Sequence, residues 1–244
     1  MTDSAHEARD YEPQTAGQTL LRVEGLKRTF GRGSGAAVVL QGVNLSIARG
    51  RLVALKGRSG SGKTTLLNLL GALDQPTEGT VDFDGVVLSG LSDKARGDIR
   101  RTQMGLIFQS FALFPLMSAY ENVEFAMRIA GVPASARKEA ALQALDYVGL
   151  KPRMHHRPFE MSGGEQQRTA IARAIAHKPK LLLADEPTAE LDSRTGLHIL
   201  SVLRDLVREE GMTVVMTTHD PAIMEIVDEV YELEDGTIVE ASKL

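Results

Sequence analysis

Cysteine and tryptophan are absent from the 244 residues, and aromatic side chains of all kinds make up only 5% of the chain. Without cysteine the chain has no disulfide and no thiolate metal site, which fits a reducing compartment. No apolar run approaches the ~18 residues that a membrane-spanning helix needs. The first residues include Asp3, Glu7 and Asp10 and have no apolar core, so they do not form a secretory signal. We therefore expect a cytoplasmic protein that reaches a membrane only through a partner.

The charge balance excludes a strong field of either sign. The formal net charge is −4, so no global positive potential attracts nucleic acid. The hydrophobic fraction of 43% is ordinary for a globular protein. Residues 1–19 are polar, lack periodicity and contain Pro13 and Gly17, which predicts a disordered tail. The remainder, residues 20–244, is long enough for one large domain with a subdomain.

One loop organises the rest of the chain: Gly57-Arg58-Ser59-Gly60-Ser61-Gly62-Lys63-Thr64. It follows an apolar run of strand length, Leu52–Leu55, and precedes a helical pattern that stops at Gly71. Strand, glycine loop and helix together form a phosphate cradle, because glycines turn backbone N–H groups inward and the helix start adds its dipole. Lys63 would reach the β- and γ-phosphates, and the Thr64 hydroxyl would bind Mg²⁺. The alternative is a Gly/Ser surface loop with an incidental lysine.

The segments around this loop predict an α/β fold that begins with antiparallel strands. Val43, Leu45 and Ile47 alternate with polar residues, as in a half-buried strand, and Asp84-Gly85 is typical of a hairpin turn. Beyond a strand at residues 104–108, two helical patterns end at Gly131 and Gly149. They predict a helical insert over about residues 108–165.

Apolar side chains crowd together directly after Gln109. They are Phe111, Leu113, Phe114, Leu116, Met117 and Tyr120. Such a cluster is either internal packing or an exposed docking patch, and the sequence favours neither.

A second turn suited to phosphate lies at Met161-Ser162-Gly163-Gly164-Glu165. Two glycines free the backbone, Ser162 supplies a hydroxyl, and a helix begins at Glu165. Taken alone, the same residues also describe an ordinary capped helix start.

Two buried strands deliver acidic and basic side chains. The apolar run 180–184 ends in Asp185-Glu186, at the strand end where open α/β sheets bind ligands. Asp185 would hold Mg²⁺, and Glu186 would take a proton from a water that attacks phosphate. The run Thr213–Thr217 delivers His219, which is either structural or close to the γ-phosphate.

In this order the motifs resemble the nucleotide-binding subunit of ABC transporters, from about Leu20 to the C-terminus. The first loop matches the family's Walker A loop, and Gln109 matches its glutamine loop. Residues 161–165 match the LSGGQ signature, with Glu165 in place of glutamine. Residues 181–186 match Walker B, residues 189–192 match the D-loop with Ala189-Glu190 in place of Ser-Ala, and His219 matches the switch histidine.

The resemblance implies a P-loop NTPase (RecA-like) core, an antiparallel β subdomain and a helical subdomain. It also implies which residues contact ATP: Phe30 against the adenine, Gly57, Arg58, Ser59, Gly60, Ser61, Gly62, Lys63, Thr64 and Thr65 around the phosphates, and Ser162, Gly163, Gly164, Glu165 and Asp192 from a second copy. Mg²⁺ would be held by Thr64, Gln109 and Asp185, and the catalytic groups would be Glu186, His219 and Gln109.

The same resemblance implies a head-to-tail homodimer that closes on ATP and drives a membrane permease on a separate chain, from the cytoplasmic face. The sequences "FQSFALFP" and "MSGGEQQR" are most similar to the branch that serves lipoprotein release and macrolide efflux. An extracytoplasmic or lipoprotein component is a further possible partner, and nucleic acid is not expected. Two alternatives differ in class: a soluble ABC-type ATPase acting on ribosomes or DNA, and a P-loop kinase.

Overall fold

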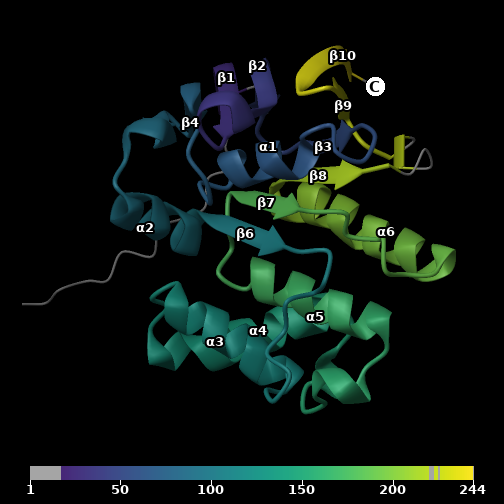
Figure 1. Cartoon of the computed structure of the whole chain (residues 1–244). Helices are drawn as coiled ribbons and strands as arrows, with labels where there is room; N and C mark the ends of the chain where they lie inside the picture. The colour runs from purple at the N-terminus through teal and green to yellow at the C-terminus, as the bar shows by residue number, and fades with distance from the viewer. Residues whose placement is uncertain (1–17, 220–222, 225, 244) are drawn as a thin grey trace, which may run out of the picture.

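The computed structural model describes residues 18–243 except 220–222 and 225. Its centre is a six-stranded sheet in the order β10-β9-β3-β8-β7-β6 (Figure 1). Five strands are parallel, and β10 runs antiparallel to β9. The strands are β3 (Leu52–Lys56), β6 (Met104–Ile107), β7 (Leu181–Ala184), β8 (Thr213–Thr218), β9 (Glu229–Glu234) and β10 (Thr237–Lys243).

A second, antiparallel sheet has four strands in the order β2-β1-β4-β5. They are β1 (Thr19–Phe30), β2 (Ala37–Ala48), β4 (Glu78–Phe83) and β5 (Val86–Val87). The predicted hairpin turn at Asp84-Gly85 joins β4 to β5, and both residues have the positive φ that a two-residue turn requires. The prediction of an antiparallel opening to the fold is therefore confirmed.

Six α-helices flank the parallel sheet: α1 (Lys63–Leu70), α2 (Asp93–Gln103), α3 (Ala119–Ile129), α4 (Ala134–Tyr147), α5 (Gly163–Ile175) and α6 (Ser193–Glu210). In Figure 1, α1 lies between the two sheets, and α3, α4, α5 and α6 lie on the other side of the parallel sheet.

Alternate residues of each parallel strand supply two separate cores. On β3, Val53 and Leu55 pack with α1 and the antiparallel sheet, whereas Leu52 and Ala54 pack with the helices on the opposite face. Continuous apolar strands are expected where both faces of a sheet are covered. The loops that follow β3, β7 and β8 consequently meet at one edge, because these strands run in the same direction.

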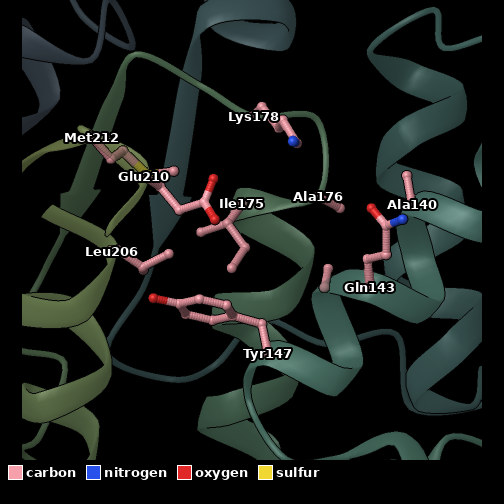
Figure 2. A pocket seen from close by; sticks show the side chains of 10 residues that line it. Ala140, Gln143, Tyr147, Ile175, Ala176, Lys178, Leu206, Glu210 and Met212 are labelled. Carbon is pink, nitrogen blue, oxygen red and sulfur yellow. The ribbon is translucent and has the colours of Figure 1, made fainter. Parts of the chain in front are cut away.

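The helical insert packs on the core along α4, α5 and α6. A cavity of about 130 Å³ lies between these helices, with Tyr147 of α4 beneath Leu206 of α6 (Figure 2). The Tyr147 hydroxyl is buried and has no hydrogen-bond partner among the described residues. Burial, together with the nearby carboxylates of Glu209, Asp205 and Glu210, raises the pKa of Tyr147 to about 12. The contact between insert and core is thus incompletely packed.

The structure differs from the sequence predictions at two places, and one further prediction falls outside the described residues. Thr19 begins β1, so it belongs to the sheet and not to the predicted tail, and the Gln18 carbonyl next to it accepts a hydrogen bond from the Arg49 amide. Helix α2 was not predicted, because it buries only Arg96 and has no apolar stripe. Asp220 and Pro221, which in the sequence are typical of a capped helix start, lie outside the described residues.

Within residues 18–243, gaps excepted, no helix combines the length and hydropathy needed to cross a bilayer.

Candidate functional site

The loop that follows β3 fits tightly between neighbouring strands. A Cβ atom on Gly57 would lie 2.4 Å from the Leu233 carbonyl oxygen of β9. Gly62 has φ 104°, and a Cβ there would lie 2.8 Å from Cδ2 of Leu40 on β2. Both positions therefore require glycine, for space at Gly57 and for space and backbone conformation at Gly62.

Lys63 is the first residue of α1, and its side chain folds back across the loop. Its ammonium donates to the carbonyl oxygens of Gly57 at 2.8 Å and Arg58 at 3.0 Å, and the residue is only 6% exposed. The Ser61 hydroxyl is also buried and lacks a hydrogen-bond partner among the described residues. A buried cation, an unpaired hydroxyl and the amides of a helix start suit the phosphates of a nucleotide.

The structure brings this loop to the predicted acidic pair. Asp185 Oδ1 accepts hydrogen bonds from the Thr64 hydroxyl at 3.2 Å and from the Thr217 hydroxyl at 2.6 Å. The Thr217 hydroxyl in turn accepts from the Glu186 amide at 2.8 Å. Residues from α1, β7 and β8 thus meet at the edge where the parallel strands end.

Glu186 stands beside the predicted histidine. Its backbone has φ 43°, in the left-handed region, and its Oε2 lies 3.4 Å from Nδ1 of His219. The His219 side chain is 67% exposed, while that of Glu186 is 24% exposed. The two residues line a hollow of about 150 Å³ together with Thr188, Ala189 and Thr218.

Gln109 lies at the same edge of the sheet. It follows β6, and the Asp185 amide donates to the Ile107 carbonyl at 2.9 Å, which joins the ends of β6 and β7. Gln109 itself is exposed.

The second glycine turn is held by its own residues. The Ser162 hydroxyl accepts from the Glu165 amide at 3.3 Å, and Glu165 Oε2 accepts from the Ser162 amide at 2.8 Å. Glu165 Oε1 also lies 3.2 Å from Nε of Arg153. The hydrogen bond from the Ser162 backbone, with smaller contributions from Arg153 and Arg168, keeps the pKa of Glu165 below its ordinary value. The turn is thus a capped helix start in which Ser162 is exposed and Glu165 is half-buried.

This second turn packs against the loop that precedes α6. A Cβ on Gly164 would lie 2.4 Å from Cγ2 of Thr195, and one on Gly163 would lie 3.5 Å from Leu191. Asp192 caps α6 by accepting from the amides of Arg194 and Thr195, both at 3.1 Å.

The predicted site residues therefore form two groups. The first contains the Gly57–Thr64 loop, the acidic pair and His219. The second contains the Ser162–Glu165 turn and Asp192. Helices α1 and α5, which begin at the two glycine turns, lie on opposite faces of the parallel sheet (Figure 1).

Phe30 lies at the end of β1, with 43% of its surface exposed. The Arg28 guanidinium stacks 4.3 Å from the centre of its ring. The three remaining loop residues of the prediction, Arg58, Ser59 and Gly60, are exposed, and Thr65 is half-buried in the first turn of α1.

The apolar cluster after Gln109 divides between the two alternatives. Tyr120 packs on the core of the insert, whereas Leu116 is 80% exposed. Phe114 is 43% exposed and meets Phe125 edge to face, with ring centres 5.1 Å apart.

Sequence reasoning missed two residues of the site. Thr217 is fully buried yet polar, and its only signal is a hydroxyl inside an apolar strand. Arg153 precedes the second turn by nine residues and lies in a short 3₁₀ helix, so spacing alone gave no reason to pair it with Glu165.

Comparison with known proteins gives a consistent result. The pattern of the ABC transporter family matches residues 40–189. The lipoprotein-releasing system ATP-binding protein LolD of Hyphomonas neptunium is 42% identical over 91% of this chain and 98% of its own. The macrolide export ATP-binding/permease protein MacB 1 of Aeromonas hydrophila is 45% identical over 91% of this chain, which covers 34% of that longer protein.

Solved structures share the fold. A dimeric ATP-binding cassette, MJ0796, described in a post-hydrolysis state with ADP and Pi, has a TM-score of 0.85 and 39% identity. The match covers 92% of this chain and 99% of that one. With its glycine loop, acidic pair and signature turn in the positions described above, this chain belongs to the ABC transporter family, as an ATP-binding ATPase subunit.

Proposed function

We propose that two copies of this chain close head to tail around two ATP molecules and thereby drive a membrane permease on a separate chain. The observation that carries the proposal is the division of the site into two groups on opposite faces of one sheet. A phosphate bound to the Gly57–Thr64 loop would lie near the acidic pair and His219 of the same copy. The Ser162–Glu165 turn of that copy, however, begins on the opposite face of the parallel sheet. A second copy supplies the missing turn.

Within each copy, Lys63, the loop amides and the Ser61 hydroxyl would bind the phosphates, with Phe30 against the adenine. Thr64, Gln109 and Asp185 would hold Mg²⁺, because Thr64 and Asp185 already bring two oxygen ligands of the type it prefers within 3.2 Å of each other. Bound Mg²⁺ would neutralise charge on the phosphates.

Glu186 is proposed as the general base. Its carboxylate would orient the attacking water and accept its proton, and His219, 3.4 Å away, would hold both Glu186 and the γ-phosphate in place. Both residues occur in every copy, so a homodimer would have two competent sites.

From the second copy, Ser162, Gly163, Gly164 and Glu165 would approach the γ-phosphate, with Asp192 at the edge of the contact. The Ser162 hydroxyl accepts from the Glu165 amide, so its own proton remains available to a phosphate oxygen. ATP would contact both copies and favour the closed state, and loss of the γ-phosphate would release it.

The cysteine-free sequence permits a direct test of this arrangement. Ser59→Cys and Gly163→Cys in one chain would place a thiol on each of the two turns, at positions without tight packing. In an ATP-loaded, hydrolysis-deficient protein, a bifunctional thiol reagent should link the copies into a dimer. The pair Ser59→Cys and Ser201→Cys, with the second thiol on the exposed part of α6, is the control. Equal linking of both pairs, or none with ATP, would contradict the head-to-tail arrangement.

The coupling surface would be the exposed part of the apolar cluster, Phe114 and Leu116, which follows Gln109 in the sequence. Leu116→Asp should preserve ATP hydrolysis by the isolated protein but reduce co-purification with a permease from detergent-solubilised membranes. Val87→Asp, on a strand of the antiparallel sheet that is 46% exposed at this position, is the matched control. Unchanged recovery of the permease with Leu116→Asp would reject this surface.

The location and the cargo follow from the same proposal. The chain would act at the cytoplasmic face of a membrane, as one ATPase domain from about residue 20 with a helical subdomain over about residues 108–165.

Similarity to LolD and MacB supports export of a lipoprotein, peptide or macrolide-like substrate, with an extracytoplasmic component as a further partner. The same pull-down identifies these partners by mass. ATPase activity stimulated by ribosomes or DNA would instead favour the alternative class.

A further inference from the structure

Thr217 occupies a position between the two catalytic carboxyl residues that the family motifs do not explain. It is the fifth residue of β8, is completely buried, and precedes His219 by two residues. Its hydroxyl donates to Asp185 Oδ1 at 2.6 Å and accepts from the Glu186 amide at 2.8 Å. The Thr217 hydroxyl therefore donates one hydrogen bond and accepts another, and its two partners, Asp185 and Glu186, are consecutive residues directly after β7.

The end of β7 explains why a hydroxyl is needed there. The ladder between β7 and β8 continues through Ala184 and Met216. Strand β7 ends at Ala184, and Glu186 lies beyond the ladder with its backbone in the left-handed region at φ 43°. The Thr217 hydroxyl accepts from the Glu186 amide in place of a backbone carbonyl. Left-handed conformations of non-glycine residues persist only where the surroundings hold them.

We propose that Thr217 is a positioning residue that fixes Asp185 and Glu186 relative to each other, and so sets the geometry of the metal ligand and the general base together. The proposal rests on the function proposed above. The bond to Asp185 orients the oxygen that Thr64 also contacts, and the bond to Glu186 anchors the backbone from which the carboxylate reaches His219. Thr217 itself need not touch nucleotide.

Three substitutions separate the hydroxyl from the volume of the side chain. Thr217→Val keeps the shape and removes both hydrogen bonds, Thr217→Ser keeps the hydroxyl, and Thr217→Cys has a weak donor of similar size. Thr213→Val is the matched control, because the Thr213 hydroxyl is buried at the opposite end of β8 and accepts from the Gly50 amide at 2.9 Å.

The kcat for ATP hydrolysis should be lower the more of the Thr217 hydrogen bonding a variant loses. We expect kcat for Thr217→Val to drop about 10- to 100-fold, since small displacements of catalytic groups have effects of this size, while KM for ATP changes little. Thr217→Cys should lie between Val and Ser, and Thr217→Ser should remain close to the unchanged protein. The Mg²⁺ concentration for half-maximal activity should rise in Thr217→Val. A Thr217→Ser variant as slow as Thr217→Val, or a Thr213→Val variant with the same loss of kcat, would overturn the proposal.

A second measurement does not depend on ATP hydrolysis. Amide hydrogen exchange at Glu186 in the nucleotide-free protein should be slow in the unchanged chain and in Thr217→Ser. It should be faster in Thr217→Val and unaffected in Thr213→Val. Equal protection in all four proteins would reject the anchoring role even if the proposed function holds. An unchanged protein that lacks ATPase activity would reject the proposed function but leave the exchange result intact. If Thr217→Val does not fold, the comparison of Cys with Ser decides both measurements.

Discussion

The Gly57–Thr64 loop and the Ser162–Glu165 turn both place glycines at the start of a helix, yet their surroundings differ. The first is enclosed by strands of both sheets and lies against Asp185, with a buried lysine bonded to its carbonyls. The second closes on itself through Ser162 and Glu165 and packs on Thr195. The first turn therefore has groups that can perform chemistry, whereas the second offers only hydrogen bonds. A nucleotide clamp needs both kinds of turn, and they need not belong to the same copy.

Removing the base from the first region should have the largest effect. Glu186→Gln should reduce kcat about 10²- to 10⁴-fold, because a positioned general base contributes this much. ATP binding should persist, and size-exclusion chromatography with ATP should show a stable dimer. Glu78→Gln, a surface carboxylate on β4 paired with Lys27, is the control. Turnover at the unchanged rate would exclude Glu186 as the base.

Removing the cation should affect binding before chemistry. Lys63→Ala should weaken ATP binding roughly 10- to 100-fold, since hydrogen bonds from a charged donor are worth about 1.5–3 kcal/mol. Calorimetric titration measures this loss. Lys56→Ala, seven residues earlier and paired with Glu232 at the end of β3, should bind ATP normally. Equal losses in both variants would indicate damage to β3 and not a missing phosphate contact.

Filling the second turn should spare ATP binding by the monomer and weaken dimerisation. Gly164→Ala places a methyl group against Thr195, and overpacking of this kind shifts the backbone at a cost to folding of about 1–3 kcal/mol. Because the displaced turn would no longer fit a partner's nucleotide, we expect about tenfold weaker ATP-dependent dimerisation, a change of about 1.4 kcal/mol. Analytical ultracentrifugation measures it. Gly97→Ala, in helix α2, is the control.

The double variant Gly164→Ala/Thr195→Ser then sharpens the comparison, because serine lacks the clashing methyl group. Full recovery of dimerisation would make Gly164 a packing glycine only. Failure to recover would support its close approach to a partner's phosphate.

The smallest effect is expected for Glu165→Gln, which restores the family's usual residue. Glutamine keeps the cap on Ser162 but loses the ion pair with Arg153, whose side chain is 41% exposed, so stability should change by less than about 1 kcal/mol.

The pKa of Glu165 is lowered on folding from its ordinary value of 4.5. Its contribution is therefore present above that pH and is lost as the pH falls through the lowered value. Urea unfolding at several acidic pH values should show a weaker pH dependence for Glu165→Gln as the pH falls from 4.5 through the lowered pKa, and an unchanged dependence would contradict the assignment.

The sequence predicted the features that depend on local chemistry. A strand before Gly57, a hairpin at Asp84-Gly85 and a capped helix after Ser162 each follow from residues within a few positions of one another. Helix α2 was missed because its residues have no apolar periodicity and only Arg96 is buried. Thr217 was missed because its role arises from the termination of a neighbouring strand, 31 residues away from its partner amide at Glu186.

The tight fit of Gly57 and Gly62 has a consequence for energetics. A loop wedged between Leu233 and Leu40 is already shaped before nucleotide arrives, so little ordering entropy is lost when phosphate binds. The binding free energy that would otherwise be spent on ordering the pocket remains available for the proposed closure of two copies and for the work done on the proposed membrane partner.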